Sequence, residues 1–174
     1  MVIIVEGLDG VGKTTICKEL CQQLPLTYIK ESYTNDNTEK EKRIQLMFER
    51  IFSKDKYLYD RTTLIDDFVY NFLNESESSL KDYFEIIIVL LSKCQIFHLC
   101  LDEKVRRERF EERGDQYITN DMMKDVAEAY QKFYANLNNV EMINLSGVLS
   151  KDVKKLVRRI KKWQKYHILC LVIY

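Results

Sequence analysis

Apolar residues along this chain occur either in short continuous runs or in longer stretches with helical spacing. The runs are typical of strands buried in a parallel sheet, and the spaced stretches are typical of amphipathic helices. The sequence predicts strands at residues 2–5, 26–29, 57–59, 95–101 and 141–145. It predicts helices at residues 13–24, 39–53, 64–73, 80–91, 102–112, 122–136 and 151–165. Strands that alternate with helices predict an α/β fold in which helices cover both faces of a parallel sheet.

Length and composition favour one domain over residues 1–174. The chain is 46% hydrophobic and 31% charged, which suits a single packed core and argues against disorder. Its 27 basic residues equal its 27 acidic residues, so we expect no nucleic-acid partner. Five cysteines without a CxxC pair, together with two histidines, disfavour zinc and indicate reduced thiols. An apolar run that starts at Val2 without a charged segment before it is unlike a signal peptide, so we expect a cytoplasmic protein without a membrane partner.

The strongest motif is a G-x-x-x-x-G-K-T sequence placed between a predicted strand and a predicted helix. Its glycines let successive backbone N–H groups and the helix N-terminus converge on a phosphate. In such a P-loop, Lys13 reaches the β- and γ-phosphates and the Thr14 hydroxyl is a ligand of Mg²⁺. The motif predicts that ATP binds to Gly7, Gly10, Val11, Gly12, Lys13, Thr14 and Thr15.

Other features indicate which P-loop protein this is. The chain has no N-K-x-D sequence to read guanine, and large ATPases need more sheet than 174 residues supply, so a small kinase remains. Asp60 and Arg61 end the third predicted strand, where open parallel sheets bind ligands. We expect Asp60 to hold Mg²⁺ and the planar fork of Arg61 to bind a phosphate. The alternative is an ordinary ion pair at the strand end.

An arginine-rich stretch follows the fourth predicted strand. Arg106, Arg109 and Arg113 follow three- and four-residue spacing, so on a helix they share one face and could close over a triphosphate. Gly114-Asp115 offers a hinge, which predicts a lid at about residues 106–120. The alternative is a solvated helix, because glutamates are interleaved with the arginines.

These elements together resemble the thymidylate kinase family of nucleoside monophosphate kinases. The likeness runs from Met1 to about Leu145 and rests on the P-loop with its central Asp9, on Asp60-Arg61, and on the stretch from Leu101 to Gly114. It implies a P-loop kinase fold with the doubly wound strand order 2-3-1-4-5. The segment Lys30-Glu31-Ser32-Tyr33-Thr34 replaces the R-E-P-G-G-T of the family, so the chain looks more like the compact, divergent kinases of phages.

The resemblance also implies roles for individual residues. Asp9 looks like the carboxylate that receives a deoxyribose 3′-hydroxyl, Arg61 like the clamp on the acceptor phosphate, and Lys30 like the replacement for a binding arginine. Gly10 stands where some members carry an arginine, and Arg109 and Arg113 are the candidates to supply that charge. The implied reaction is Mg²⁺- and ATP-dependent phosphorylation of a deoxynucleoside monophosphate, dTMP to dTDP first among them, in nucleotide biosynthesis.

Two other functions remain open at this point. In the related deoxynucleoside kinases a glutamate after the second strand acts as base on a nucleoside 5′-hydroxyl, and Glu31 stands at that place. A P-loop switch or regulatory subunit would bind nucleotide without turnover. A homodimer is possible, and the apolar tail at 167–174 could be an edge strand, a dimer contact or a frayed end. His98, within an apolar run, is interpreted as a core residue.

Overall fold

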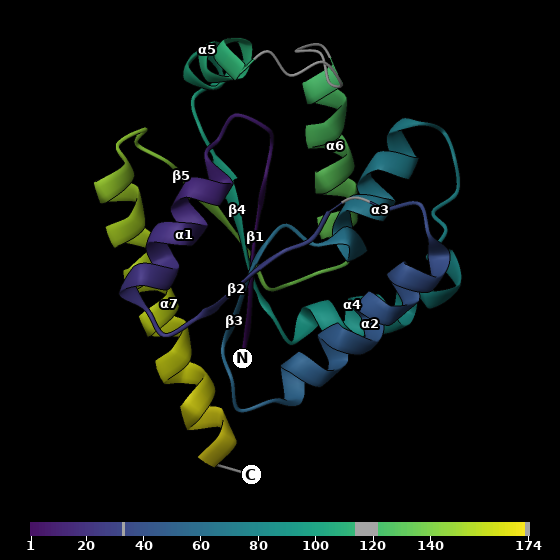
Figure 1. The fold of residues 1–174 in the computed structure, drawn as a ribbon, viewed down its shortest axis with the longest axis horizontal. Helices are drawn as coiled ribbons and strands as arrows, with labels where there is room; N and C mark the ends of the chain where they lie inside the picture. Colours follow the sequence, from purple (N-terminus) through teal and green to yellow (C-terminus); the bar gives the residue numbers. More distant parts are fainter. Residues whose placement is uncertain (33, 114–121, 173–174) are drawn as a thin grey trace.

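A five-stranded parallel sheet forms the centre of the molecule, with the strand order β2-β3-β1-β4-β5 (Figure 1). The computed structural model describes residues 1–32, 34–113 and 122–172, with their side chains except those of 110, 111, 113 and 166–172. The predicted α/β fold and strand order are therefore confirmed. The strands are β1 (Val2–Gly7), β2 (Thr27–Lys30), β3 (Tyr57–Asp60), β4 (Gln95–Cys100) and β5 (Val140–Asn144).

Helices cover both faces of this sheet. One face packs against α1 and α7, and the other against α2, α3, α4 and α6, so the sheet lies between two hydrophobic cores (Figure 1). A further helix, α5, follows the carboxyl end of β4. The helices are α1 (Lys13–Gln23), α2 (Asn37–Phe52), α3 (Thr63–Leu73), the 3₁₀ turn η1 (Lys81–Tyr83), α4 (Phe84–Ser92), α5 (Glu103–Arg113), α6 (Met122–Tyr134) and α7 (Leu149–Val172).

Gly7 ends β1 at a point where the backbone passes very close to β4. Its φ is 140°, and a Cβ atom there would lie 2.6 Å from the carbonyl oxygen of Leu99. Only glycine accepts both the conformation and the contact. The loop that follows therefore leaves the sheet between β3 and β4, the two neighbours of β1.

Two helices differ from the prediction. The helix expected at 80–91 is divided into η1 and α4. Ser78 and Ser79 donate hydrogen bonds to Asp67 and Leu80 is buried, so the segment is fixed against α3 where the helix was expected to begin. The last helix extends beyond residue 165, because no glycine or proline follows to stop it. Residues 167–172 of the apolar tail are thus helical, and 173–174 lie outside the described residues.

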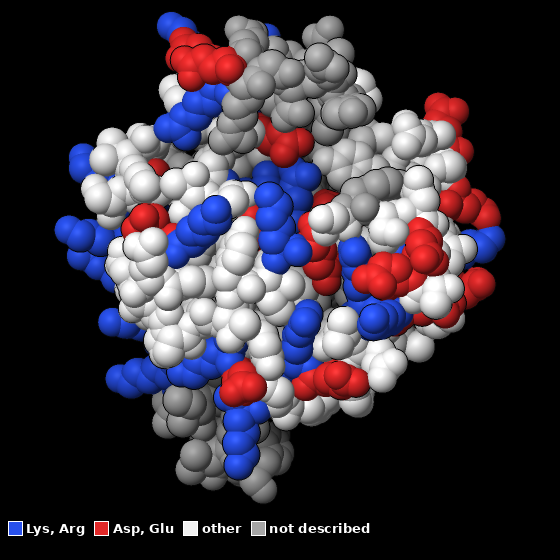
Figure 2. All heavy atoms as spheres, in the orientation of Figure 1, with Lys and Arg blue, Asp and Glu red and all other residues white. Residues whose placement is uncertain are grey.

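Basic side chains gather along α7, at the left edge of Figure 2, and include Lys151, Lys154, Lys155, Arg158 and Arg159. Elsewhere on this face acidic and basic side chains are mixed, as the balanced composition leads one to expect (Figure 2). Within the described ranges, no helix is long and apolar enough to cross a membrane.

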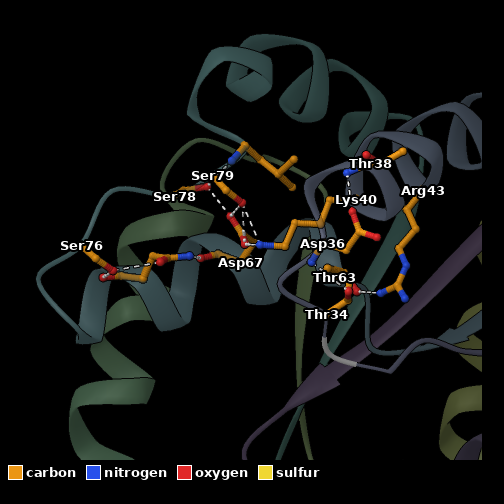
Figure 3. A network of polar contacts seen from close by, with 12 residues as sticks. Thr34, Asp36, Thr38, Lys40, Arg43, Thr63, Asp67, Ser76, Ser78 and Ser79 are labelled. Carbon is orange, nitrogen blue, oxygen red and sulfur yellow. Dashed lines mark hydrogen bonds and ion pairs between the residues drawn. The ribbon is translucent and has the colours of Figure 1, made fainter.

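A buried ion pair joins α2 to α3 (Figure 3). Lys40 Nζ donates to Asp67 Oδ1 at 2.5 Å and to Ser79 Oγ at 2.7 Å, and Ser78 Oγ donates to Asp67 Oδ2 at 2.5 Å. Burial by itself would raise the pKa of Asp67, but the hydrogen bonds from Lys40 and Ser78 lower it. We call Lys40, Asp67, Ser78 and Ser79 the Lys40–Asp67 cluster. Its two serine hydroxyls are hydrogen-bond partners of the ion pair.

Candidate functional site

The P-loop connects β1 to α1 and turns through two left-handed glycines. Gly10 has a φ of 85°, and Gly12, with a φ of 90°, directly precedes α1. Lys13 opens the helix, and its Nζ donates to the carbonyl oxygens of Gly7 at 2.7 Å and Leu8 at 2.8 Å. Burial, followed by the nearby Arg61, lowers the pKa of Lys13 to about 8. The P-loop thus encloses the ammonium group of its own lysine.

Thr14 and Asp60 meet at the carboxyl end of β3. Thr14 Oγ1 donates to Asp60 Oδ2 at 2.6 Å, and the Tyr28 hydroxyl donates to the same oxygen at 2.8 Å. The structure thus brings together the two residues that we expected to hold Mg²⁺. A hydroxyl and a carboxylate oxygen are hard donors, and Mg²⁺ needs only one or two such protein ligands beside the substrate phosphates.

Asp9 and Arg61 form an ion pair across the mouth of the P-loop. Arg61 Nη2 donates to Asp9 Oδ1 at 2.6 Å, and Arg61 Nε is buried with no hydrogen-bond partner in the described part of the chain. The backbone of Arg61 has a φ of 69°, which costs a non-glycine residue about 1–2 kcal/mol. Its N–H donates to the carbonyl oxygen of Val5 at 3.1 Å, which ties the strained turn to β1. The guanidinium is therefore held in place, while its Nε–H finds no acceptor among the described residues.

Lys30 and Glu31 lie at the carboxyl end of β2, next to the carboxyl end of β3. Lys30 is the last residue of β2, and the Glu31 carboxylate accepts from Thr63 N at 2.8 Å and from Thr62 Oγ1 at 3.3 Å. Glu31 therefore binds the N-terminus of α3, where a negative charge is favoured. Its second neighbour is Arg43 Nη1, at 4.0 Å.

A single cleft of about 930 Å³, which we call the P-loop cleft, collects most of these residues. Of the predicted ATP-binding residues, Gly7 and Val11 do not line it, and the Val11 side chain is buried. Helices α3 and α6 supply the opposite wall, with Asp66, Tyr70, Leu73, Asn74, Met122 and Val126. The predicted site residues that line the cleft are Asp9, Gly10, Gly12, Lys13, Thr14, Thr15, Lys30, Asp60 and Arg61.

Sequence reasoning missed a group of two acids and a tyrosine near Arg61, in which Glu6 and Tyr130 are buried and Asp66 is half-buried. Glu6 Oε1 accepts from Thr62 N at 2.9 Å, and the Tyr130 hydroxyl lies 3.2 Å from Glu6 Oε2 and 3.1 Å from Asp66 Oδ1. Burial raises the pKa of both carboxyls. We call Glu6, Asp66 and Tyr130 the Glu6–Tyr130–Asp66 cluster. Its one visible signal in the sequence is Glu6, an acid at the end of an apolar strand.

His98 lies beside this cluster, on β4. It is buried, and its Nδ1 forms a hydrogen bond with the Tyr134 hydroxyl at 2.9 Å. Burial, assisted by the charges of Lys13 and Arg61, lowers the pKa of His98 to about 4, so the ring is neutral at pH 7. This position agrees with the interpretation of His98 as a core residue.

The structure places two of the three lid arginines in different surroundings, and neither lines the P-loop cleft. Arg109 Nη2 donates to the carbonyl oxygen of Gly147 at 3.1 Å, and its Nη1 lies 3.9 Å from the position of a Cβ on Gly12. Arg106 lines a different cleft, because its part of α5 is turned into the protein. The side chain of Arg113 and residues 114–120 of the predicted lid lie outside the described residues.

Comparisons with known proteins add a family and a set of related folds. Residues 3–99 match the sequence model of the ATPase family associated with various cellular activities (AAA). Our exclusion of large ATPases by length therefore did not exclude this family. The SPbeta prophage-derived uncharacterized protein YorR of Bacillus subtilis is 26% identical over 142 residues, which are 77% of this chain and 82% of YorR.

Solved structures share the fold at low sequence identity. The crystal structure of YorR in complex with phosphorylated GDP has a TM-score of 0.72 at 20% identity, over 95% of this chain and 98% of that one. Deoxyadenosine kinase from M. mycoides with bound dCTP has a TM-score of 0.63 at 18% identity, over 93% and 100%. Thymidylate kinase from Candida albicans has a TM-score of 0.57 at 16% identity, over 94% of this chain and 92% of that one. These proteins are similar to the chain in fold.

Proposed function

This chain belongs to the ATPase family associated with various cellular activities, and we propose that it transfers the γ-phosphoryl group of ATP to a deoxynucleoside monophosphate, with dTMP as the preferred acceptor. The observation that carries this proposal is Arg61, which lines the P-loop cleft and whose buried Nε has no hydrogen-bond partner within residues 1–32, 34–113 and 122–172. An unpaired buried donor is costly, and a dianionic phosphate would satisfy it. The kinase fold of the structural neighbours, and the nucleotides bound in their structures, support a nucleotide as ligand.

The donor nucleotide would bind at the N-terminus of α1. The left-handed turns at Gly10 and Gly12 present backbone N–H groups to its phosphates. Lys13 would exchange the carbonyl oxygens of Gly7 and Leu8 for phosphate oxygens, whose negative charge favours the charged form of the ammonium group. Arg109, beside Gly12, brings a second cation to the same end of the loop.

The acceptor would bind between β2, β3 and α3. Arg61 and Lys30 supply positive charge for its phosphate, and Asp9, which Arg61 already holds, would receive the 3′-hydroxyl. The attacking phosphate oxygen is ionised at pH 7, so the reaction needs no general base. Catalysis then rests on positioning and on charge, which the three cations Lys13, Lys30 and Arg61 provide within one cleft.

Mg²⁺ fits the pair formed by Thr14 and Asp60. Their oxygens lie 2.6 Å apart at the edge of the P-loop, and both are of the type that the ion prefers. When bound, the ion would neutralise charge on the β- and γ-phosphates. Tyr28, which donates to the same Asp60 oxygen, would fix the orientation of that carboxylate.

A deoxynucleoside kinase is the second candidate, because Glu31 lines the P-loop cleft where a base for a 5′-hydroxyl would be needed. Against it, the Glu31 carboxylate already accepts hydrogen bonds from Thr62 and Thr63. A nucleotide switch without turnover would not need Asp9 and Arg61 in the cleft, and ATP turnover that depends on a deoxynucleotide distinguishes a kinase from such a switch.

Kinetics of Arg61 and Glu31 variants with dTMP and thymidine, measured side by side, test the proposal. Arg61→Ala should weaken dTMP binding about ten- to hundredfold, because it removes a charge-assisted pair worth roughly 1.5–3 kcal/mol. Arg61→Lys should recover little, since a point charge cannot replace the fork. Glu31→Gln should have a mild effect, and Arg158→Ala, an exposed arginine on α7, is the control.

The opposite pattern would overturn the choice. A nucleoside kinase needs a base, so Glu31→Gln would lower turnover with thymidine by about a hundredfold or more. Arg61→Ala would then affect dTMP and thymidine alike.

A further inference from the structure

A second cleft of about 980 Å³ lies between α5, α6 and the β4–β5 edge of the sheet. This volume is in the range of small-molecule sites, about 300–1,000 Å³. Its lining is largely apolar, with a few charged and polar groups at the α5 and α6 sides. The apolar lining includes Leu8 and Val11 from the P-loop, Leu101 after β4, Met123 and Ala127 from α6, and Met142 from β5.

Arg106 is the charged group at this cleft that the fold leaves incomplete. Its side chain is buried, with a relative exposure of 4%, and no described residue forms a hydrogen bond with its Nη1. Burial lowers the pKa of Arg106, while Glu103 and Asp9 oppose that shift from a distance. A guanidinium stays charged at neutral pH, and a buried charge without a hydrogen-bonded partner is destabilising.

The second cleft is separate from the P-loop cleft, because the two share no lining residue. The wall between them consists of the P-loop and α6. Along the P-loop, Leu8 and Val11 line the second cleft whereas Asp9 lines the first. Along α6, Met123 lines the second cleft whereas Met122 lines the first. Arg109, unlike Arg106, lies beside Gly12 of the P-loop, and it does not line the second cleft.

We propose that the second cleft binds a small organic anion, with an apolar or aromatic body against α6 and the β4–β5 edge and a carboxylate or phosphate on Arg106. The apolar lining favours a ring or hydrocarbon, because its burial removes apolar surface from water. The unpartnered Nη1 favours an anionic oxygen. Lys124 also lines the cleft and adds positive charge around the same ligand, whereas the charge of Arg107 is balanced by its ion pair with Glu103, another lining residue.

Fluorescence titration with 8-anilinonaphthalene-1-sulfonate tests this site, since the probe combines an aromatic body with one anion. The P-loop cleft is first filled with Mg²⁺ and a non-hydrolysable ATP analogue. We expect the probe to bind under these conditions and Arg106→Met to weaken it about tenfold or more. Arg158→Met, which removes an exposed arginine of α7, should leave the affinity unchanged. N-phenyl-1-naphthylamine, the ring system without the anion, should bind about tenfold more weakly.

A cavity-filling variant keeps the test decisive if Arg106→Met does not fold. Ala127→Leu adds volume at the α6 wall and should also weaken the probe about tenfold, with circular dichroism confirming the helix content. Displacement by benzoate or by phenyl phosphate would support the site and identify the preferred anion. The proposal is wrong if the ATP analogue displaces the probe, or if neither benzoate nor phenyl phosphate competes with it. It is also wrong if N-phenyl-1-naphthylamine binds as tightly as the probe, or if the folded variants at Arg106 and Ala127 bind the probe with normal affinity.

Discussion

Two buried polar clusters lie next to each other along α3, and they are built in opposite ways. The Lys40–Asp67 cluster pairs a cation with an anion and adds two serine hydroxyls (Figure 3). The Glu6–Tyr130–Asp66 cluster brings together two acids and a single hydroxyl. Asp66 and Asp67 are adjacent in sequence. Burial raises the pKa of Asp66, whereas hydrogen bonds that outweigh burial lower the pKa of Asp67. The Lys40–Asp67 cluster joins α2 to α3, and the Glu6–Tyr130–Asp66 cluster lies next to the P-loop cleft, which Asp66 lines.

Proton count explains this difference. Tyr130 has one hydroxyl proton and lies within hydrogen-bond distance of both Glu6 and Asp66. Both contacts are favourable only if one of the carboxyls carries a proton, which agrees with their raised pKa values. Glu6 in turn accepts from the N–H of Thr62, the residue after Arg61. The protonation of this cluster therefore bears on the turn that carries the proposed phosphate clamp.

The largest effect should come from breaking the Lys40–Asp67 cluster. Asp67→Asn leaves the Lys40 ammonium buried without a counter-charge and should lower the free energy of unfolding by about 3–5 kcal/mol. Urea denaturation measures the loss, with Asp82→Asn, an exposed carboxylate on η1, as control. The folded variant should keep its kcat. A loss below about 1 kcal/mol, as for a surface pair, would contradict the assigned role.

The neighbouring substitution, Asp66→Asn, should affect activity more than stability. It removes the unfavourable interaction between the buried Glu6 and the half-buried Asp66, so the free energy of unfolding should change by less than about 1 kcal/mol. The charge that faces Arg61 changes, and we expect kcat/KM for dTMP to fall about tenfold, chiefly through KM. Steady-state kinetics beside Asp67→Asn check this result. Equal losses of stability in the two variants would mean that the clusters do not differ in kind.

The pH dependence of stability should have opposite signs in the two clusters. A raised pKa in the folded state means that the contribution of Asp66 is full below its unfolded value of about 3.8 and is lost as the pH rises above it. A lowered pKa means that the contribution of Asp67 is present above about 3.8 and is lost as the pH falls below it. Each slope should be at most about 1.4 kcal/mol per pH unit.

Urea denaturation from pH 3 to pH 8 measures these slopes, with the wild type compared with Asp66→Asn and with Asp67→Asn. The wild type should lose stability relative to Asp66→Asn as the pH rises, and relative to Asp67→Asn as the pH falls. Slopes of the same sign in both comparisons would contradict the opposite pKa shifts.

The local parts of this molecule could be predicted from its sequence. The P-loop is one contiguous segment, Asp60 ends β3 and Arg61 follows it, and the strand order implied by the family resemblance puts β3 beside β1, which leads into the P-loop. The Glu6–Tyr130–Asp66 cluster could not be predicted, because its hydrogen bonds join residues 64 and 124 positions apart. Helical spacing put Arg106 and Arg109 on one face, but it could not show how α5 is turned against the sheet.

The most direct test of the central claim is phosphoryl transfer itself. Mg²⁺ and ATP labelled at the γ-phosphate are offered to the four deoxynucleoside monophosphates and to thymidine, with the wild type beside Lys13→Ala. We predict that label passes to a monophosphate, fastest to dTMP, and that Lys13→Ala lowers the rate by about a hundredfold or more while the fold stays intact. Transfer to thymidine but to no monophosphate, or a folded Lys13→Ala variant with a near-normal rate, would contradict the account.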